Sequence, residues 1–461
     1  MTNPDAAAVQ LDALGPQGAF RARNRTAVHD VAGKEVAELS LVPSLFVDRA
    51  MKALRRASTP ALDDRIAMIG RAADLFAAAT LSDQSVEEYE YQVSRVGGIP
   101  ISVVRATTQA IAARMRKAHY SVEHARPTGA VRHWDDPLTR TGRAVWTRRG
   151  NVFAVHAAGN HPGPHSLWPE ALALGYRVAV RPSRREPFTP HRLATALREA
   201  GFGNDQVTLL PTDHATADTL LRGADLGLVY GGDDVVRKYA ADPSILPQGP
   251  GRSKILLTEE KDWRDHLDTI VDSVSGKGGT GCVNTTAVFV EGDPTPFCEA
   301  LAERLASVPS LPPEDARAVF PVQPIATAKA FEAHLLHKAS GAKPWLGGDG
   351  IIDELGDGSA VLRPAIHQLG RPDAPQASVE LPFPCVWVAP WTREAGIAPL
   401  RNSLVLTTIT HDAGLVEQLL EEPSISNVYV GDHPTHWMES GMPHDGYLAD
   451  FLMRCKSVVR G

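Results

Sequence analysis

The sequence predicts an α/β protein in which a doubly wound parallel sheet forms the first lobe and a second α/β lobe follows. Two observations lead to this class. The chain has 461 residues, more than one hydrophobic core usually supports. From residue 151 onward, short apolar strands alternate with amphipathic helices, a pattern that produces βαβ units and a parallel sheet covered on both faces.

A helical layer is expected before this alternation. Residues 44–80 and 86–120 have helical periodicity, because apolar side chains recur on one face. In the first stretch these side chains are Phe46, Ala50, Met51 and Leu54, followed by Ile66, Ile69, Ala72, Ala73 and Phe76. Residues 126–149 instead alternate around Asp135-Asp136-Pro137, a turn signal, and predict a β-hairpin.

The two alternations divide into elements as follows. The first has strands over 151–157, 176–181, 206–210, 226–230 and 253–258, separated by helices over 164–174, 189–200, 214–223 and 233–241. The second has helices over 263–275 and 295–307, and strands at 285–290 and near 384–389, 403–408 and 427–430. Between them, the proline-rich stretch 308–325 is expected to be an irregular surface connection.

Composition excludes several classes of partner. Apolar residues make up 43% and charged residues 22%, as in an ordinary soluble protein. The net charge of −7 supplies no broad basic surface, so we expect a small molecule and not nucleic acid as the main partner. The start, Met1-Thr2-Asn3-Pro4-Asp5, lacks signal-peptide features, and no apolar run has membrane-spanning length. We therefore expect a cytoplasmic protein without membrane contacts.

The cysteines predict free thiols. Cys282, Cys298, Cys385 and Cys455 are far apart and form no CxxC pair, which argues against disulfides and structural zinc. Two groups of histidines, His156, His161 and His165, and His433, His436 and His444, lack carboxylates at ligand spacing, so no catalytic metal is expected. Such histidines more often line a pocket.

The sharpest chemical signal is the run Gly276-Lys277-Gly278-Gly279-Thr280-Gly281-Cys282, which lies between an expected helix and an expected strand. Glycines let backbone N–H groups approach a ligand, where they can lower the pKa of the thiol and stabilise an oxyanion. A cysteine beside a flexible loop is more often a core residue. The surrounding motifs favour a nucleophile instead.

Those motifs together resemble the aldehyde dehydrogenase superfamily. Their order along nearly the whole chain carries the resemblance: Gly159-Asn160-His161-Pro162, Arg181-Pro182-Ser183-Arg184, Tyr230-Gly231-Gly232, Cys282, Glu380-Leu381-Pro382-Phe383-Pro384 and Lys456-Ser457-Val458-Val459. The resemblance implies that Cys282 is the nucleophile and that Asn160 is an oxyanion donor. It also implies that Gly231 and Gly232 face the cofactor pyrophosphate and that Glu380 holds the nicotinamide ribose.

The resemblance further implies a division into three parts. A dinucleotide-binding domain is expected over 1–125 and 150–258, a catalytic domain over 259–446, and an oligomerisation arm over 126–149 and 447–461. In this family the C-terminal strand pairs with a hairpin like 126–149. We therefore expect a homodimer or a tetramer of dimers.

One departure from the family concerns the general base. Hydrolytic members carry a glutamate where this chain has Gln248, and an amide cannot act as a base near neutral pH. A thiol acceptor needs less base assistance than water, so interconversion of an aldehyde and an acyl thioester, with coenzyme A as a possible partner, is slightly favoured. Hydrolysis with His161, His444 or Asp445 as the base stays open, as does a catalytically silent scaffold.

A second departure concerns the cofactor. Arg181 and Arg184 replace a lysine and a glutamate around Ser183, and Arg185 adds a further positive charge. Guanidinium groups suit a 2′-phosphate, so NADP is preferred over NAD. A solvated basic strand end is the alternative.

The third departure concerns the substrate entrance. At the C-terminal motif the chain has Gly441-Met442-Pro443-His444-Asp445-Gly446, so substrate identity does not follow from the family. The residues we expect to line the substrate pocket are His161, Trp168, His436 and His444.

Overall fold

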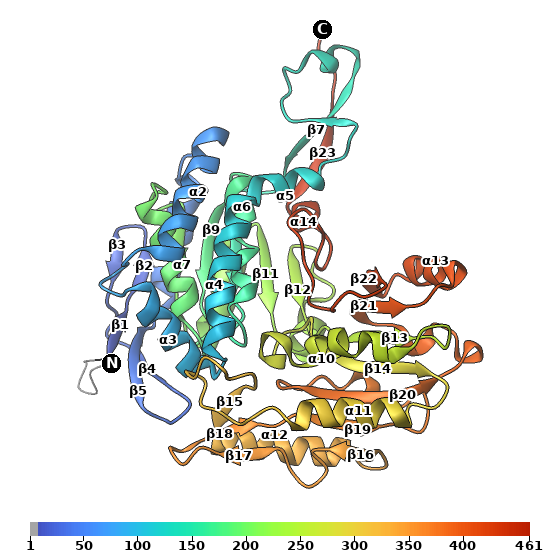
Figure 1. Ribbon diagram of the computed structural model, residues 1–461. Coiled ribbons are helices and arrows are strands. Elements are labelled where there is room, and N and C mark those ends of the chain that lie inside the picture. The colour runs from blue at the N-terminus through green and yellow to red at the C-terminus, as the bar shows by residue number, and fades with distance from the viewer. Residues whose placement is uncertain (1–7) are drawn as a thin grey trace.

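The computed structural model describes residues 8–461; residues 1–7, where we expect no signal peptide, lie outside the described part. Two seven-stranded sheets form the centres of two lobes, and a narrow arm projects from the first lobe (Figure 1). The predicted α/β class with two lobes is confirmed. No helix among residues 8–461 combines the length and apolar character needed to cross a bilayer.

The first sheet has the strand order β12-β11-β8-β9-β10-β2-β3. Its parallel strands are β8 (Val152–His156), β9 (Arg177–Arg181), β10 (Val207–Leu209), β11 (Leu226–Tyr230) and β12 (Ile245–Gln248). The antiparallel β2 (Ala13–Gly15) and β3 (Gly18–Phe20) extend it. The chain passes from β8 to β10 in one direction and then crosses to β11 on the other side of β8. Ligands of doubly wound sheets bind at such a switch point, beyond the carboxyl ends of the strands.

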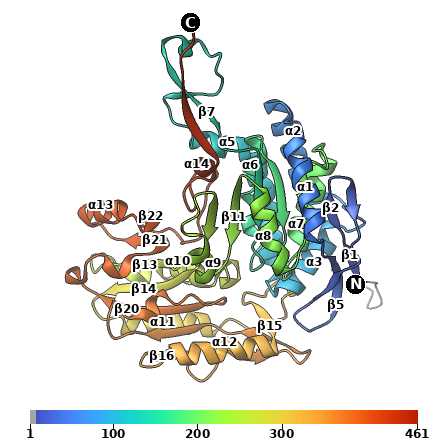
Figure 2. The same cartoon turned by 180° about the vertical axis from the view of Figure 1, so that it is seen from behind.

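Side chains of these strands alternate between two cores. Phe153 and Val155 point into one core with α2 (Leu62–Ala78), α3 (Val86–Gly97), α4 (Ile101–Arg116), α6 (Pro169–Ala173) and α7 (Phe188–Glu199). Val152 and Ala154 point into the other, against α1 (Ser44–Arg56), α8 (His214–Gly223) and α9 (Asp233–Tyr239), which face the viewer in Figure 2. Helices therefore cover both faces of the sheet, as the apolar strands predict.

The predicted helical stretches are interrupted. The stretch 44–80 is divided into α1 and α2, because Ala57 has extended backbone and Pro60 disfavours helix just before it. The stretch 86–120 contains α3, α4 and the start of α5 (Ala118–His124). A capping box of Ser85 and Glu88 starts α3, and left-handed Gly98, with φ 66°, ends it.

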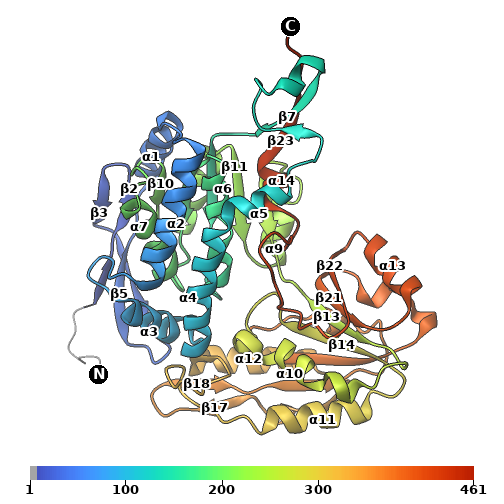
Figure 3. The same ribbon diagram turned by 45° about the horizontal axis from the view of Figure 1, so that its top comes forward.

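The second sheet has the order β16-β19-β20-β14-β13-β21-β22. Its strands are β13 (Ser253–Leu257), β14 (Thr285–Glu291), β16 (Lys343–Leu346), β19 (Ala365–Gln368), β20 (Cys385–Trp391), β21 (Ser403–Ile409) and β22 (Ile425–Val430). All pairs are parallel except that of β16 with β19. One face packs against α10 (Leu267–Ser275) and α11 (Thr295–Ala306), and the other against α12 (Ile325–Lys338) and α13 (Ala413–Glu421) (Figure 3).

Strand β13 corrects one expectation. We assigned residues 253–258 to the first sheet, but β13 pairs with β14 and β21 in the middle of the second. The last strand of the first sheet is β12, which the sequence does not signal because Pro247 and the following Gly-Pro-Gly run resemble a loop. The chain therefore crosses between the sheets at residues 249–252.

The arm is a three-stranded sheet with the order β23-β7-β6. β7 (Arg143–Arg148) pairs antiparallel with the C-terminal β23 (Met453–Val458), as expected. The predicted hairpin is wrong, since β6 (Ala130–Val131) pairs with β7 in parallel. Asp136 caps a short 3₁₀ helix over Pro137–Thr141, and this helix takes the place of a tight turn. The short α14 (Leu448–Leu452) leads into β23.

Smaller sheets complete the fold. β1 (Val9–Leu11), β5 (Glu35–Ser40) and β4 (Arg25–His29) form one, and β15 (Val322–Pro324), β18 (Ser359–Leu362) and β17 (Ile352–Glu354) form another. The N-terminal strands were not predicted, because they are short and contain few apolar residues. As predicted, most of the stretch 308–325 is irregular.

Candidate active site

A cavity of about 1080 Å³ lies at the carboxyl ends of the first sheet's parallel strands. Four of its walls follow β8, β9, β11 and β12, and a fifth is one face of α4. The second lobe contributes Lys277, the segment from Gly281 to Val283, Glu380, His436, Met438 and His444. The cavity therefore occupies the position that the switch point predicts for a ligand.

Cys282 lies in the wall of this cavity and is partly exposed. Its loop begins with a 3₁₀ turn over Gly276–Gly279, in which Lys277, Gly278 and Gly279 have positive φ values of 54°, 79° and 63°. A Cβ on Gly279 would lie 2.7 Å from Pro384 Cδ, so only glycine allows this close packing. Cys298 and Cys385 are buried and Cys455 is exposed outside the cavity.

The electrostatics of the Cys282 thiol differ from expectation. Burial raises the pKa of Cys282 above its ordinary value, and the nearby Glu380 and Asp445 act in the same direction. The backbone N–H groups of Cys282 and Val283 oppose this, as expected, but they do not outweigh it. In this state of the protein the thiol is therefore protonated near neutral pH, and a positive charge beside it would favour the thiolate.

Asn160 lies beside the cysteine loop. It follows β8, and its Nδ2 donates a hydrogen bond to the carbonyl oxygen of Thr280 at 3.1 Å. A Cβ on the preceding Gly159 would lie 2.5 Å from Ser183 Cβ, so the loops after β8 and β9 are in direct contact. The structure thus brings Asn160, Ser183 and Cys282 into one cavity, as the motifs predict.

Gln248 is the last residue of β12, is buried, and lines the cavity with Gly249 and Pro250. The side chain at this position is an amide, whereas hydrolysis would need a base there.

Glu380 contacts the crossover between the lobes. Its Oε2 accepts a hydrogen bond from the backbone N–H of Arg252 at 2.7 Å, and Arg252 also pairs with Asp233 at 2.7 Å. Burial raises the pKa of Glu380 to about 7, despite these N–H donors. The carboxyl group lines the cavity, so it can accept hydrogen bonds from a ligand there.

The three arginines near the end of β9 have different partners. Arg181 donates to Thr212 Oγ1 at 2.8 Å, and Arg185 donates to Gln323 Oε1 at 3.2 Å. Arg184 has a buried Nε atom for which the described residues provide no acceptor. All three line the cavity together with Ser183, whose hydroxyl accepts from the Arg185 N–H at 3.2 Å. An unpaired buried guanidinium nitrogen fits an anionic ligand such as a phosphate.

The two glycines at the start of α9 are placed differently. Gly231 lines the cavity, whereas Gly232 caps the helix and is not part of the lining. A Cβ on Gly231 would lie 2.5 Å from Val235 Cβ, so this glycine is also required by local packing. Asp233 and Asp234 occupy the first turn, and their charges do not favour a pyrophosphate at this helix end.

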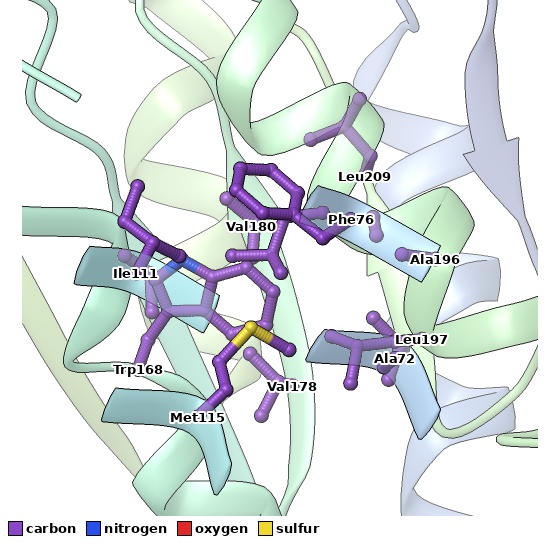
Figure 4. Packing of buried hydrophobic residues seen from close by; sticks show 14 of the residues in the cluster. Ala72, Phe76, Ile111, Met115, Trp168, Val178, Val180, Ala196, Leu197 and Leu209 are labelled. Atoms are coloured by element: carbon purple, nitrogen blue, oxygen red, sulfur yellow. The ribbon is translucent and has the colours of Figure 1, made fainter. Parts of the chain in front are cut away.

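Three of the four expected substrate-pocket residues line the cavity, namely His161, His436 and His444. The prediction for the fourth residue, Trp168, is wrong, because Trp168 does not line the cavity. It is 1% exposed and packs among Ile111, Met115, Val178 and Val180 (Figure 4). The apolar face that surrounds it outweighs the single polar N–H of its ring. The described residues contain no group of His, Cys, Asp or Glu side chains that could hold a metal ion.

Two cations in the cavity were not predicted. Arg114 is in the last turn of α4, on the face that also presents Ser102, Val103, Ala106, Thr107, Ala110 and Ile111 to the cavity. Lys277 lies in the cysteine loop. The helical spacing of this face was visible in the sequence, but periodicity does not tell which side of a helix borders a cavity.

Comparisons with known proteins identify the family of this chain. Residues 21–452 match the model of the aldehyde dehydrogenase family. Malonate-semialdehyde dehydrogenase 1 of Geobacillus thermodenitrificans is 23% identical over 151 residues, and betaine aldehyde dehydrogenase 1 of Rhizobium meliloti is 26% identical over 245. These alignments cover 31% and 50% of this chain, and the same shares of the two relatives. The chain thus matches about a third to a half of the length of these relatives.

Solved structures are similar over nearly the whole chain. The NAD-dependent aldehyde dehydrogenase from Sinorhizobium meliloti has a TM-score of 0.84 at 18% identity, and covers 99% of this chain and 96% of its own. An indole-3-acetaldehyde dehydrogenase in complex with NAD⁺ has a TM-score of 0.83 at 18% identity, with 98% and 97% covered. These likenesses show the fold, and the family match over residues 21–452 shows the membership. The chain belongs to the aldehyde dehydrogenase family.

Proposed function

We propose that this protein is an NAD(P)-dependent oxidoreductase of aldehydes that works through a covalent intermediate on Cys282. The observation that carries the proposal is that one cavity, at the switch point of the first sheet, contains the Cys282 thiol, the Asn160 amide and the Glu380 carboxyl group. A scaffold without activity has no use for a nucleophile and an oxyanion donor in the same cavity.

The residues support the following chemistry. The Cys282 thiolate attacks the aldehyde carbonyl carbon and forms a thiohemiacetal, whose oxyanion accepts hydrogen bonds from the Cys282 N–H and from Asn160. Asn160 Nδ2 must first leave the Thr280 carbonyl oxygen, 3.1 Å away, or share its second N–H. When bound, the oxidised nicotinamide supplies the acceptor for the hydride and a positive charge that favours the thiolate. The product on Cys282 is a thioester.

The cavity fits a dinucleotide at its other walls. Arg184 has a buried nitrogen without an acceptor among the described residues, and Ser183, Arg181 and Arg185 line the same cavity. No carboxylate belongs to this group, which supports NADP as the preferred cofactor, with NAD as the alternative. Glu380 would accept hydrogen bonds from the nicotinamide ribose.

Gln248 supports release of the acyl group to a thiol, such as coenzyme A, or the reverse reduction of an acyl thioester. The alternative, hydrolysis, is favoured by one observation: Asp445 acts electrostatically on Cys282 and pairs with His444 at 3.6 Å. Of this pair His444 lines the cavity, so it offers a base other than Gln248.

Assembly into a homodimer or a tetramer of dimers is also proposed. Three large apolar side chains of the arm are solvent-exposed in the single chain, Trp134 at 65%, Leu138 at 50% and Val459 at 76%. A second subunit that packs on the arm would bury them.

The test is to mix the protein with NADP⁺ or NAD⁺ and a panel of aldehydes, with and without coenzyme A. Reduced nicotinamide is followed by absorbance and the product by mass spectrometry. Acyl-CoA formation that depends on coenzyme A supports the thioester route, and free acid formed equally well without a thiol supports hydrolysis.

The matched control is Cys298→Ser, since Cys298 is a buried core residue outside the cavity. Turnover that disappears in Cys282→Ser and remains in Cys298→Ser is the expected result. Normal turnover in Cys282→Ser would overturn the proposal.

A further inference from the structure

Three side chains in the wall of the Cys282 cavity have N–H donors that the described residues leave partly or wholly unused. They are Arg114, His161 and Lys277, and they come from α4, the loop after β8 and the cysteine loop. Among the lining residues in the described part of the chain, the acidic one is Glu380, which is hydrogen-bonded to Arg252. A buried donor without a partner, as at His161 Nε2, is rare in folded proteins, and beside two cations with unused donors it indicates a ligand.

His161 has a fixed tautomer. Its Nδ1 accepts a hydrogen bond from the Gly163 N–H at 3.0 Å, so the proton of the neutral ring is on Nε2. This Nε2 atom is buried, and no described residue accepts from it. Burial lowers the pKa of His161 to about 4, and Lys277 adds to the effect, so the ring stays neutral near pH 7. His161 is therefore a hydrogen-bond donor toward the cavity and not a general base.

Lys277 lies between Gly276 and Gly278 in the cysteine loop. Its φ of 54° is uncommon for a residue other than glycine, and a lysine in this strained position suggests a use for the side chain. Nζ donates to the His436 carbonyl oxygen at 2.8 Å, which leaves donors of the ammonium group unused. The nearby Asp272 is already paired with His436 at 3.0 Å.

Arg114 is held even more loosely. The Arg114 guanidinium has five N–H donors. Among the described residues it makes one long hydrogen bond, 3.5 Å to Ser166 Oγ. Glu170 and Glu439 attract it electrostatically, but neither forms an ion pair with it among residues 8–461. Burial raises the pKa of Glu170 to about 8, which weakens its compensation of Arg114 near pH 7.

The two cations also repel each other. Burial lowers the pKa of Lys277 and the charge of Arg114 lowers it further, while Asp272 and Cys282 oppose this without outweighing it. An anion between them would satisfy the free donors and remove this repulsion. We propose that Arg114, His161 and Lys277 form a subsite for an anionic group, a carboxylate or a phosphate, on the tail of the aldehyde substrate. This rests on the proposed function and names its substrate class.

The test compares aldehydes of matched length that end in a carboxylate, a phosphate, a methyl ester or a methyl group. We expect kcat/KM to be about 10- to 100-fold higher for an anionic aldehyde than for its neutral counterparts, as hydrogen bonds to charged groups provide. Whether the carboxylate or the phosphate is preferred identifies the group. Equal kcat/KM for anionic and neutral aldehydes would overturn the subsite while leaving the proposed function intact.

Variants assign the effect to the residues. Arg114→Met and Lys277→Met should each lose most of the anionic preference, measured as the ratio of kcat/KM for the anionic aldehyde to kcat/KM for its neutral counterpart, and mainly through KM. Arg114→Lys and His161→Gln, which keep a charge and an N–H respectively, should retain part of it. The control is Arg105→Gln, which removes a cation from α4 that pairs with Glu90 and does not line the cavity. Equal losses for anionic and neutral aldehydes would contradict the subsite.

A binding measurement separates this result from failure of the chemistry. In Cys282→Ala protein, which cannot react with the aldehyde, calorimetry with the anionic aldehyde should show binding that weakens in Arg114→Met and not in Arg105→Gln. Binding that is unchanged in Arg114→Met would overturn the subsite even if turnover were seen. Absence of turnover with every aldehyde, despite cofactor binding, would overturn the proposed function itself.

Discussion

Gly251 lies directly against Cys282. A Cβ atom on Gly251 would be 2.7 Å from the Cys282 carbonyl carbon, 3.0 Å from its Cβ, and closer still to its carbonyl oxygen. Ser253 Oγ donates to that same oxygen at 3.0 Å. The crossover between the two sheets therefore supports the backbone of the nucleophile, and the position of the thiol depends on how the lobes are connected.

Gly251→Ala should impair catalysis more than stability. The added methyl group meets backbone atoms, which cannot rotate away, so the Cys282 loop must shift. We expect kcat/KM to fall by at least about tenfold and the free energy of unfolding by about 1–3 kcal/mol, as for overpacked sites. Steady-state kinetics and urea denaturation measure the two effects. Gly70→Ala is the control, because a Cβ there meets nothing within 4 Å, and wild-type kinetics in Gly251→Ala would contradict the contact.

Glu380→Gln should change how stability depends on pH. The pKa of Glu380 is raised from 4.5 to about 7, so the folded protein holds this proton to higher pH than the unfolded chain. Wild-type stability therefore falls as pH rises from about 4.5 to 7, and this destabilisation is fully present above pH 7. The variant should gain thermal stability over wild type near pH 8 and not near pH 4. Glu421→Gln, an exposed residue outside the cavity, should show no such difference.

The same carboxyl group should make cofactor affinity pH-dependent. An ionised carboxylate accepts stronger hydrogen bonds from ribose hydroxyls than a neutral one. Equilibrium titration should show tighter NADP⁺ binding by the wild type at about pH 8 than at about pH 6, on either side of the Glu380 pKa of about 7. In Glu380→Gln this pH dependence should disappear, and its persistence would show that another group controls binding.

The sequence was informative where periodicity and motif order act together. Alternating strands and helices predicted the first sheet, and the motifs brought Asn160, Ser183, Cys282 and Glu380 to one cavity. It was less informative where tertiary context decides. Pro247 and its neighbours resemble a loop, yet β12 is held in the sheet by its pairing with β11. Trp168 is assigned to the core by packing, and the pKa of Cys282 is decided by burial, neither of which a local motif encodes.

Arg184→Gln should shift cofactor preference. Its buried Nε lacks a partner among the described residues, whereas Arg181 is already hydrogen-bonded to Thr212. Loss of one charge-assisted contact to a 2′-phosphate should lower kcat/KM for NADP⁺ by about 10- to 100-fold and leave that for NAD⁺ within about threefold. Arg222→Gln serves as control, since this exposed arginine of α8 does not line the cavity. An equal decrease for both cofactors would argue against 2′-phosphate recognition.

Removal of the negative charge at Glu380 should also make Cys282 more reactive. The charge of Glu380 is, after burial, the largest contribution that raises the pKa of the Cys282 thiol. In Glu380→Gln the pKa should therefore decrease, and the thiolate fraction near pH 8 should increase. The rate of alkylation by iodoacetamide at Cys282, followed by peptide mass spectrometry, should rise several-fold. Exposed Cys455 provides an internal reference whose rate should stay the same, because it lies in the arm, outside the cavity. If both cysteines accelerate together, the variant has opened the fold; if neither does, the charge of Glu380 does not reach the sulfur.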